Sequence, residues 1–188
     1  MSLEKTINLF KEMLEVNNID LNDPNFINTP TRAGKAFHQF LKGYTQEEIN
    51  GVLSHSFPSK LNDMVIIRDI PAYMLCPHHL LPCFLRINIG YIPNGTVLGL
   101  SKFKRLAKII TQKPLLQEEL TEILADIIYN NLKPDGVMIT VVGKHMCMCM
   151  RGIEQPDSKV STSAVRGNFV NHQTKSEFLD LINGEDKL

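Results

Sequence analysis

The segment MLCPHHLLPC, residues 74–83, holds side chains of the kinds that bind metal ions. Cys76 is followed two and three residues later by His78 and His79, in surroundings where Leu or Val would pack better. Cys76 and His79 have the spacing with which a tight turn directs two side chains at one Zn²⁺ ion. His78 is then free to act as an acid or a base. The segment predicts half of a zinc site.

A second segment, residues 144–152 (KHMCMCMRG), supplies the other half. Interpreted as a strand, it has methionines on one face and, on the other, His145, Cys147, Cys149 and Arg151. At about 3.3 Å per residue, His145 then lies roughly 7 Å and Arg151 roughly 13 Å from Cys147, a row that fits an elongated anionic substrate. Cys147 would be the third ligand and water the fourth, as in catalytic zinc sites. Spacing alone does not choose between Cys147 and Cys149.

Two other interpretations compete with a catalytic metal site. These residues could be buried core cysteines and hydrogen-bonded histidines, and an isolated Cys-x-x-His motif is more often of that kind. A structural zinc ion is the second alternative. It requires Cys149 or Cys83 as the fourth ligand, because structural sites are closed, and it leaves His145 without a role. The coincidence of three features in two segments favours the catalytic interpretation.

The segment GLSKFKRLAK predicts an anion site at the start of a helix. Ser101 is expected to be the N-cap, and Lys102 and Arg105 lie three residues apart on one helical face. Backbone N–H groups and the helix dipole favour a phosphate at such a position. The alternative is a solvated basic face.

Two further pairs of residues have ordinary explanations when taken alone. Arg32 and Lys35, in TPTRAGKAF, fit a surface pair. Gln117 and Glu118 begin a predicted helix, where a carboxylate complements the dipole. A carboxylate there could also accept hydrogen bonds from the N1–H and 2-amino groups of guanine, but the sequence alone does not favour that role.

Composition narrows the class of protein. The chain has 188 residues, of which 43% are apolar, enough for one well-buried core. Acidic and basic residues number 20 each, so no long-range field favours nucleic acid or an anionic membrane as the partner. We see no signal peptide and no segment of membrane-spanning length, and we expect a cytoplasmic protein. Four cysteines in that reducing compartment favour metal or thiol chemistry over disulfides.

Hydrophobic periodicity and turn residues predict an α+β fold, with helices on one face of an antiparallel sheet. Thr29 is the expected N-cap of the second helix, and Pro30 its first residue. We expect an N-terminal helical region at 1–60 and a catalytic domain at 61–188. The predicted helices are 2–17, 30–42, 101–112, 115–132 and 174–182, and the predicted strands are 63–70, 83–93, 137–150 and 159–169.

The order and spacing of six motifs resemble the GTP cyclohydrolase I family. The resemblance runs from about Asp69 to Phe169, and TPTRAGK extends it toward the N-terminus. The motifs are CPHH (76–79), IGYIP (89–93), GLSKFKR (99–105), QE (117–118), HMCMCMRG (145–152) and STSAVRGNF (161–169).

The resemblance implies a tunnelling fold, in which sheets from several subunits form a barrel. It implies two rings, a homodecamer, and active sites between subunits. Zinc would be held by Cys76, His79 and Cys147, and an activated water would attack C8 of GTP and release formate. His145 would protonate the purine ring, His78 would move protons, and the product would be 7,8-dihydroneopterin triphosphate, made in the first step of tetrahydrofolate or pterin biosynthesis.

The resemblance also implies how GTP is bound. Ser101 would assist at the ribose, and Glu118 with Gln117 would recognise guanine. The triphosphate would be surrounded by five cations, which balance its charge locally in a neutral chain. These cations are Arg32, Lys35, Lys102, Arg105 and Arg151.

Some positions depart from the family pattern and motivate alternative functions. Pro77 stands where a Glu is usual, and Cys83, Leu85 and Asn88 replace the usual Phe, Gly and His. A divergent purine-nucleotide cyclohydrolase would stop at a ring-opened or cyclic-phosphate product. A non-catalytic, zinc-stabilised oligomeric binding module is the other alternative.

Overall fold

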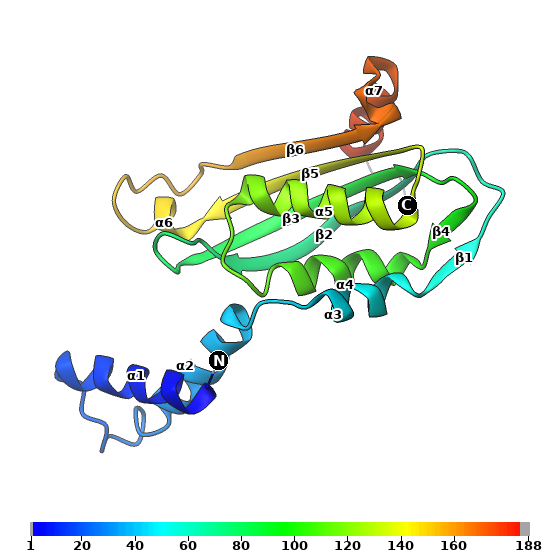
Figure 1. The fold of residues 1–188 in the computed structure, drawn as a ribbon. Coiled ribbons are helices and arrows are strands. Elements are labelled where there is room, and N and C mark those ends of the chain that lie inside the picture. Colours follow the sequence, from blue (N-terminus) through cyan, green and yellow to red (C-terminus); the bar gives the residue numbers. More distant parts are fainter. Residues whose placement is uncertain (1, 185–188) are drawn as a thin grey trace. The chain divides into compact units, whose positions relative to one another are not determined.

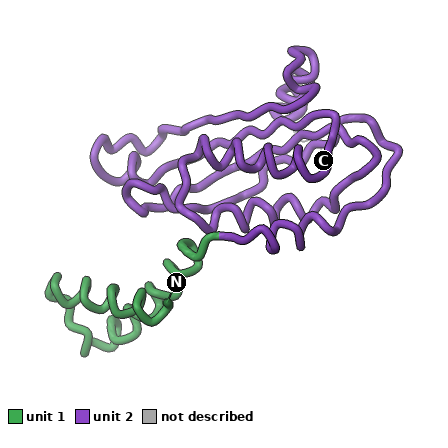
Figure 2. Tube along the Cα trace, in the orientation of Figure 1, with its two compact units in different colours: residues 1–43 green, residues 44–188 purple. Residues whose placement is uncertain are grey.

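The structure is a computed structural model that describes residues 2–184. The chain forms two compact units, residues 1–43 and residues 44–188, coloured separately in Figure 2. Within residues 2–184, none of the helices combines the length and apolar character that crossing a bilayer requires.

The first unit is a pair of helices, α1 (Leu3–Val16) and α2 (Thr29–Leu41). They contact through their apolar faces, where the rings of Phe10 and Phe37 lie 5.0 Å apart. Both helices were predicted, but the expected N-cap was wrong by one residue. Asn28 holds the N-cap position and Thr29 is already helical, with Pro30 in the first turn, where its missing N–H costs nothing.

The second unit is built on an antiparallel sheet with the strand order β2-β3-β5-β6 (Figure 1). A separate pair of short strands, β1 and β4, is also antiparallel. The strands are β1 (Ser56–Pro58), β2 (Val65–Leu75), β3 (Pro82–Ile92), β4 (Thr96–Leu98), β5 (Gly136–His145) and β6 (Val160–Gly167).

Two long helices, α4 and α5, cover one face of this sheet (Figure 1). The alternation of β3 places Leu85, Ile87 and Ile89 on the covered face, and β5 adds Val137, Ile139 and Val141. The predicted α+β class is confirmed. The remaining helices are α3 (Gln46–Leu53), α4 (Leu100–Ile110), α5 (Gln117–Leu132), the short α6 (Met146–Cys149), a 3-10 turn (Asn168–Val170) and α7 (His172–Asn183).

The domain boundary and the N-cap of α4 differ from those predicted from the sequence. Residues 44–60 were assigned to the N-terminal helical region. They include α3, which packs against α4 and buries Ile49 and Val52, and β1, which pairs with β4. Ser101 is not an N-cap. Helix α4 begins at Leu100, and Gly99, with an extended backbone, takes the cap position without a side-chain hydrogen bond.

Candidate metal centre

A closed turn between β2 and β3 fixes Cys76 and His79. The N–H of Cys76 donates to the carbonyl of Leu81, and the N–H of Leu80 donates to the carbonyl of Cys76, each over 3.0 Å. Leu80 has a φ of 51°, in the left-handed region, which allows the chain to reverse within this short span. The backbone of the turn that carries Cys76 and His79 is therefore fixed by its own hydrogen bonds.

The other segment is a helical turn rather than a strand. Strand β5 ends at His145, and the N–H of Met150 donates to the carbonyl of Met146 over 3.1 Å. The predicted strand to residue 150 is wrong, and so is the row of side chains spaced along it. The β-branched residues end at Val142, and methionine is a good helix former. Residues two apart on a helix differ in direction by about 200°, so Cys147 and Cys149 do not share a face.

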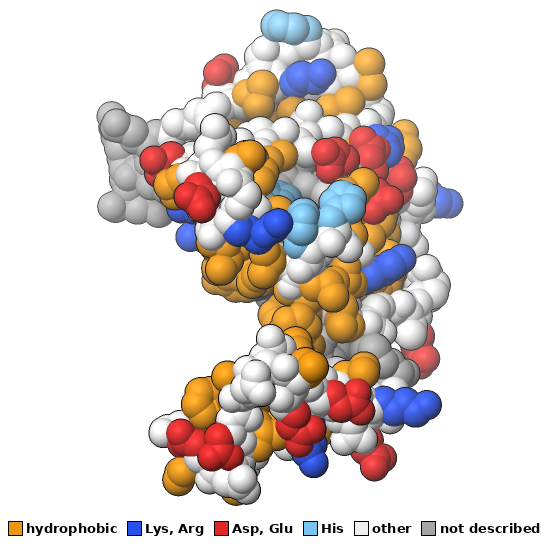
Figure 3. Space-filling model, turned by 90° about the vertical axis from the view of Figure 1, so that its left-hand side faces the viewer, with side chains coloured by type: hydrophobic (Ala, Val, Ile, Leu, Met, Phe, Trp, Pro, Cys, Tyr) orange, Lys and Arg blue, Asp and Glu red, His pale blue; other side chains and the backbone are white. Residues whose placement is uncertain are grey.

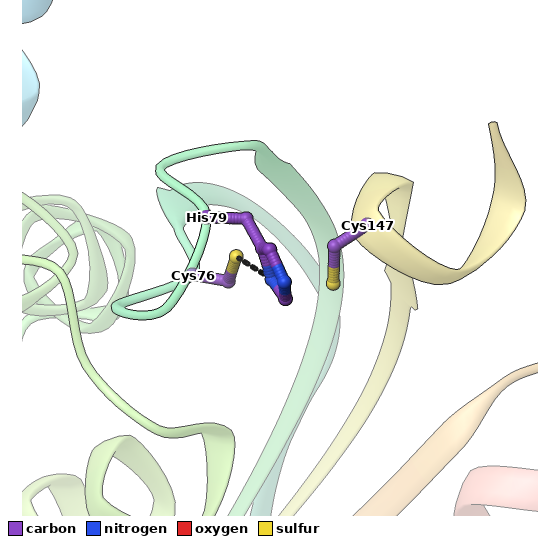
Figure 4. A group of neighbouring side chains, drawn as sticks. All are labelled: Cys76, His79 and Cys147. Atoms are coloured by element: carbon purple, nitrogen blue, oxygen red, sulfur yellow. Dashed lines mark hydrogen bonds between the residues drawn. The ribbon is translucent and has the colours of Figure 1, made fainter. Parts of the chain in front are cut away.

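Three side chains from these two segments converge (Figure 4). The ligand atoms of Cys76, His79 and Cys147 all lie within 4.8 Å of one another, and Cys76 Sγ is 3.9 Å from His79 Nδ1. Zinc binds sulfur at about 2.3 Å and imidazole nitrogen at about 2.0 Å, which places tetrahedral ligands about 3.3–3.8 Å apart. A shift of an ångström or less, about one bond rotation, would complete that geometry. The group is compatible with a metal ion.

The surroundings of Cys147 favour the protonated form of its thiol. Burial raises the pKa of the Cys147 thiol, and the hydrogen bond and charge of Cys76 raise it further. Arg151 acts in the opposite direction, so this cation lies close to Cys147. Seen from the end of the second unit that carries the turn and α6, histidine side chains gather beside Lys and Arg side chains (Figure 3).

His145 is held at both ring nitrogens, between β3 and α5. Its Nδ1 lies 3.2 Å from Cys83 Sγ, and its Nε2 lies 2.8 Å from Gln117 Oε1. Burial lowers the pKa of His145, and the charge of Glu118 acts in the opposite direction. Glu118 itself is exposed at the first turn of α5. His145 and Glu118 therefore flank one region next to Cys147.

Gln117 lies inside the protein rather than on its surface, with 2% of its area exposed. Its Nε2 donates to the carbonyls of Val141 and Val160, over 3.1 and 3.0 Å, and lies 3.2 Å from Thr162 Oγ1. Gly143 makes room for this side chain. A Cβ at residue 143 would clash with Gln117 Oε1 and would lie 3.1 Å from Gln117 Cδ.

The remaining predicted residues lie in three places. His78 is exposed, and its ring meets that of His79 edge-on at 6.2 Å. Ser101, Lys102 and Arg105 lie on α4, whose first turn follows β4 at the opposite end of the sheet (Figure 1). The ladder from the Cys83–His145 pair to the Ile92–Gly136 pair spans nine steps, about 30 Å. Within one chain, the start of α4 therefore does not reach the metal centre.

The last predicted pair, Arg32 and Lys35, lies on α2 in the first unit.

Sequence reasoning missed the partners of His145. Cys83 pairs with His145 in the β3–β5 ladder, so the two side chains share the helix-covered face. Two features of the sequence could have indicated these partners. The alternation of β3 puts Cys83 on the buried face, and Gly143 lies inside β5, where a glycine often marks a close approach by another group.

Fold and site together define an α+β protein with a candidate Cys-His-Cys metal centre at one end of an antiparallel sheet. The chain belongs to the GTP cyclohydrolase I family, whose sequence model matches residues 6–183.

Named relatives extend over nearly the whole chain. A GTP cyclohydrolase 1 of Campylobacter jejuni (strain RM1221) is 42% identical over 175 residues, 92% of each chain. A GTP cyclohydrolase 1 of Teredinibacter turnerae (strain ATCC 39867 / T7901) is 41% identical over 176 residues, 93% of this chain and 96% of the relative. Among solved structures, the archaeosine synthase QueF-Like in the apo form is 23% identical, with a TM-score of 0.47, over 56% of this chain and 94% of that one.

Proposed function

We propose that the protein is a zinc-dependent GTP cyclohydrolase I of the cytoplasm. It opens the imidazole ring of GTP by hydrolysis, releases formate and forms 7,8-dihydroneopterin triphosphate, at the start of tetrahydrofolate or pterin biosynthesis. The observation that carries the proposal is the convergence of Cys76, His79 and Cys147 beside His145, in a chain that matches the family over residues 6–183.

The donor set suits zinc in a catalytic role. Two thiols and an imidazole are ligands that zinc prefers, and three protein ligands are typical of catalytic sites. The other two cysteines have different partners: Cys83 contacts His145, and Cys149 lies 3.8 Å from the carbonyl of Pro156. When bound, zinc would supply the Lewis acidity that makes water a nucleophile at neutral pH.

The side chains around the metal centre take distinct roles in this proposal. His145 donates a proton to the purine ring through Nε2, the nitrogen that Gln117 Oε1 contacts, and the exposed His78 serves further proton transfers. Glu118 binds the N1–H and 2-amino groups of guanine, because a carboxylate accepts two such hydrogen bonds. Gln117 has its amide hydrogens engaged inside the protein, so it supports the site by holding His145.

We also propose that the active site is completed by a second copy of the chain in a barrel-shaped homo-oligomer, a decamer of the tunnelling-fold type. The supporting observation is the separation of about 30 Å along the ladder between the metal centre and the end where α4 begins. In the assembly, Ser101, Lys102 and Arg105 of one subunit face the metal centre of its neighbour and bind the ribose and the triphosphate. Arg151 and the α2 pair, Arg32 and Lys35, add positive charge.

Mixing two inactive variants tests the shared site. Cys147→Ser and Arg105→Glu each inactivate their own half, so co-refolded mixtures contain intact sites in about a quarter of positions and regain activity. Turnover of the mixture is compared with that of each variant alone. Activity of the mixture no higher than that of the separate variants would contradict a site between subunits.

The function is tested by incubating zinc-loaded protein with GTP, oxidising the product and measuring pterin fluorescence. We expect neopterin fluorescence and one formate per GTP, and neither after chelation of the metal. Mass spectrometry that finds a formamidopyrimidine or cyclic phosphate without dihydroneopterin triphosphate would favour the divergent cyclohydrolase motivated by Pro77. Absence of any turnover would favour the binding module.

Glu118→Gln tests the guanine contact. We expect the preference for GTP over ATP, measured as a ratio of kcat/KM values, to fall about 10- to 100-fold, since a hydrogen bond to a charged group contributes about 1.5–3 kcal/mol. Glu119→Gln is the matched control, because Glu119 accepts a hydrogen bond from the N–H of Leu116 and glutamine keeps that cap. An unchanged ratio in Glu118→Gln removes the guanine role.

A further inference from the structure

The imidazole of His145 is enclosed by two partners that fix where its proton resides. We propose that Cys83 is a positioning residue whose thiol donates to Nδ1 of His145, so that the neutral ring carries its hydrogen on Nε2. The inference rests on the proposed function for its effect on turnover, whereas the position of the proton follows from the hydrogen bonds alone.

Gln117 provides the first step. Its Nε2 lies within 3.1 Å of two backbone carbonyls, those of Val141 and Val160, and a carbonyl can only accept. The nitrogen of the amide must therefore be on that side, and the oxygen must face His145. Because Gln117 Oε1 is an acceptor 2.8 Å from His145 Nε2, that ring nitrogen must carry hydrogen.

Cys83 provides the second step. A neutral imidazole with hydrogen on Nε2 has a lone pair on Nδ1, which needs a donor. Cys83 Sγ lies 3.2 Å away, and its alternative acceptor, the carbonyl of Leu81, is 4.0 Å from it. The thiol of Cys83 is therefore the donor placed within reach of Nδ1.

The fold makes this contact unavoidable. Cys83 and His145 are directly opposite in the β3–β5 ladder and share the face covered by helices. Cys83 is fully buried, so water cannot replace its thiol as the donor. Without the thiol, Nδ1 loses its partner and the ring gains freedom to rotate and to exchange tautomers, which misplaces the group that meets the purine.

Three substitutions at residue 83 separate the hydrogen bond from packing. Cys83→Ala removes the donor and leaves a small gap, Cys83→Val fills the space without a donor, and Cys83→Ser restores a donor. Cys149→Ala is the matched control, since Cys149 is a free thiol that does not contact His145. Each protein is prepared as the zinc-loaded oligomer, and its zinc content, thermal unfolding, kcat and KM for GTP are measured.

We expect kcat to fall about tenfold in Cys83→Ala and Cys83→Val, with KM within about twofold and zinc content unchanged. Cys83→Ser should recover kcat to within about threefold of the parent protein, and Cys149→Ala should match the parent. Loss of zinc from the alanine and valine variants would overturn the proposal by making Cys83 a ligand. Unchanged kcat in both would also overturn it, as would equal losses in all three variants, which indicate packing alone.

Solid-state NMR of protein labelled with ¹⁵N-histidine gives a readout that does not need turnover. The signals of His145 are assigned by their loss in His145→Asn. In the parent protein and in Cys83→Ser we expect an unprotonated Nδ1 and a protonated Nε2, and in Cys83→Ala a mixture of tautomers. A protonated Nδ1 with a bare Nε2 in the parent overturns the assignment. If that NMR pattern is found but GTP is not turned over, the proposed function fails and the positioning of the ring stands.

Discussion

We expect Cys147→Ser to lose the proposed metal and turnover, and Cys149→Ser to keep both within about twofold of the parent protein. The expected difference follows from the helical turn α6, which aims Cys147 at Cys76 and His79 and leaves Cys149 against the carbonyl of Pro156. A serine hydroxyl is a poor zinc ligand at neutral pH, because it does not release its proton as a thiol does.

The measurement is zinc per chain, by elemental analysis of dialysed protein, alongside neopterin formation from GTP. We expect about one zinc per chain in the parent and in Cys149→Ser, and less than about a tenth of that in Cys147→Ser. Circular dichroism checks that both variants keep their secondary structure. Full zinc content in Cys147→Ser, or its loss from Cys149→Ser instead, would refute the assignment of the third ligand.

Gly143→Ala should be nearly as damaging, although residue 143 is not one of the candidate metal ligands. The new methyl group would clash with Gln117 Oε1 and would lie 2.9 Å from Leu85 Cδ2. Gln117 cannot retreat without losing its hydrogen bonds to the carbonyls of Val141 and Val160. Overpacking and the broken network together cost about 3 kcal/mol, and kcat should fall about 100-fold as His145 loses its partner.

Urea unfolding and GTP kinetics check this result. Gly51→Ala is the control, because a Cβ at that helical glycine meets no atom within 4 Å, and it should be neutral or slightly stabilising. In the double variant Gly143→Ala/Gln117→Ala, the clash with Gln117 is gone and only the contact with Leu85 remains, so stability should partly return while kcat stays low. Full activity in Gly143→Ala would contradict the role of Gln117 in holding His145.

The elements of the sheet and its helices were predictable because their periodicity is strong. Alternation in β3 and the apolar stripes of α1 and α5 come directly from the residues. The turn α6 was not predictable in this way. A four-residue helix has no period of its own, and the alternating HMCMCM pattern imitates a strand.

Because residues 146–150 were predicted as a strand, the third metal ligand could not be chosen from the sequence pattern alone. A strand puts Cys147 and Cys149 on the same face, so their spacing could not separate them, whereas the resemblance to the family did. The N-cap of α4 was misplaced by two residues, because Ser101 is by residue type a better N-cap than Gly99. The extended backbone of Gly99 outweighed that preference. The inward orientation of Gln117 depends on Gly143, 26 residues further along the chain, and no local pattern reports it.

The turn from Cys76 to Leu81 is closed by two backbone hydrogen bonds that involve no ion. Its side chains are thus prearranged, and capture of zinc requires little additional ordering. For the proposed zinc enzyme, we expect folding and metal capture to be separable events. On the proposed function, a cell short of zinc would then hold folded but inactive enzyme, which renewed zinc would activate without new translation.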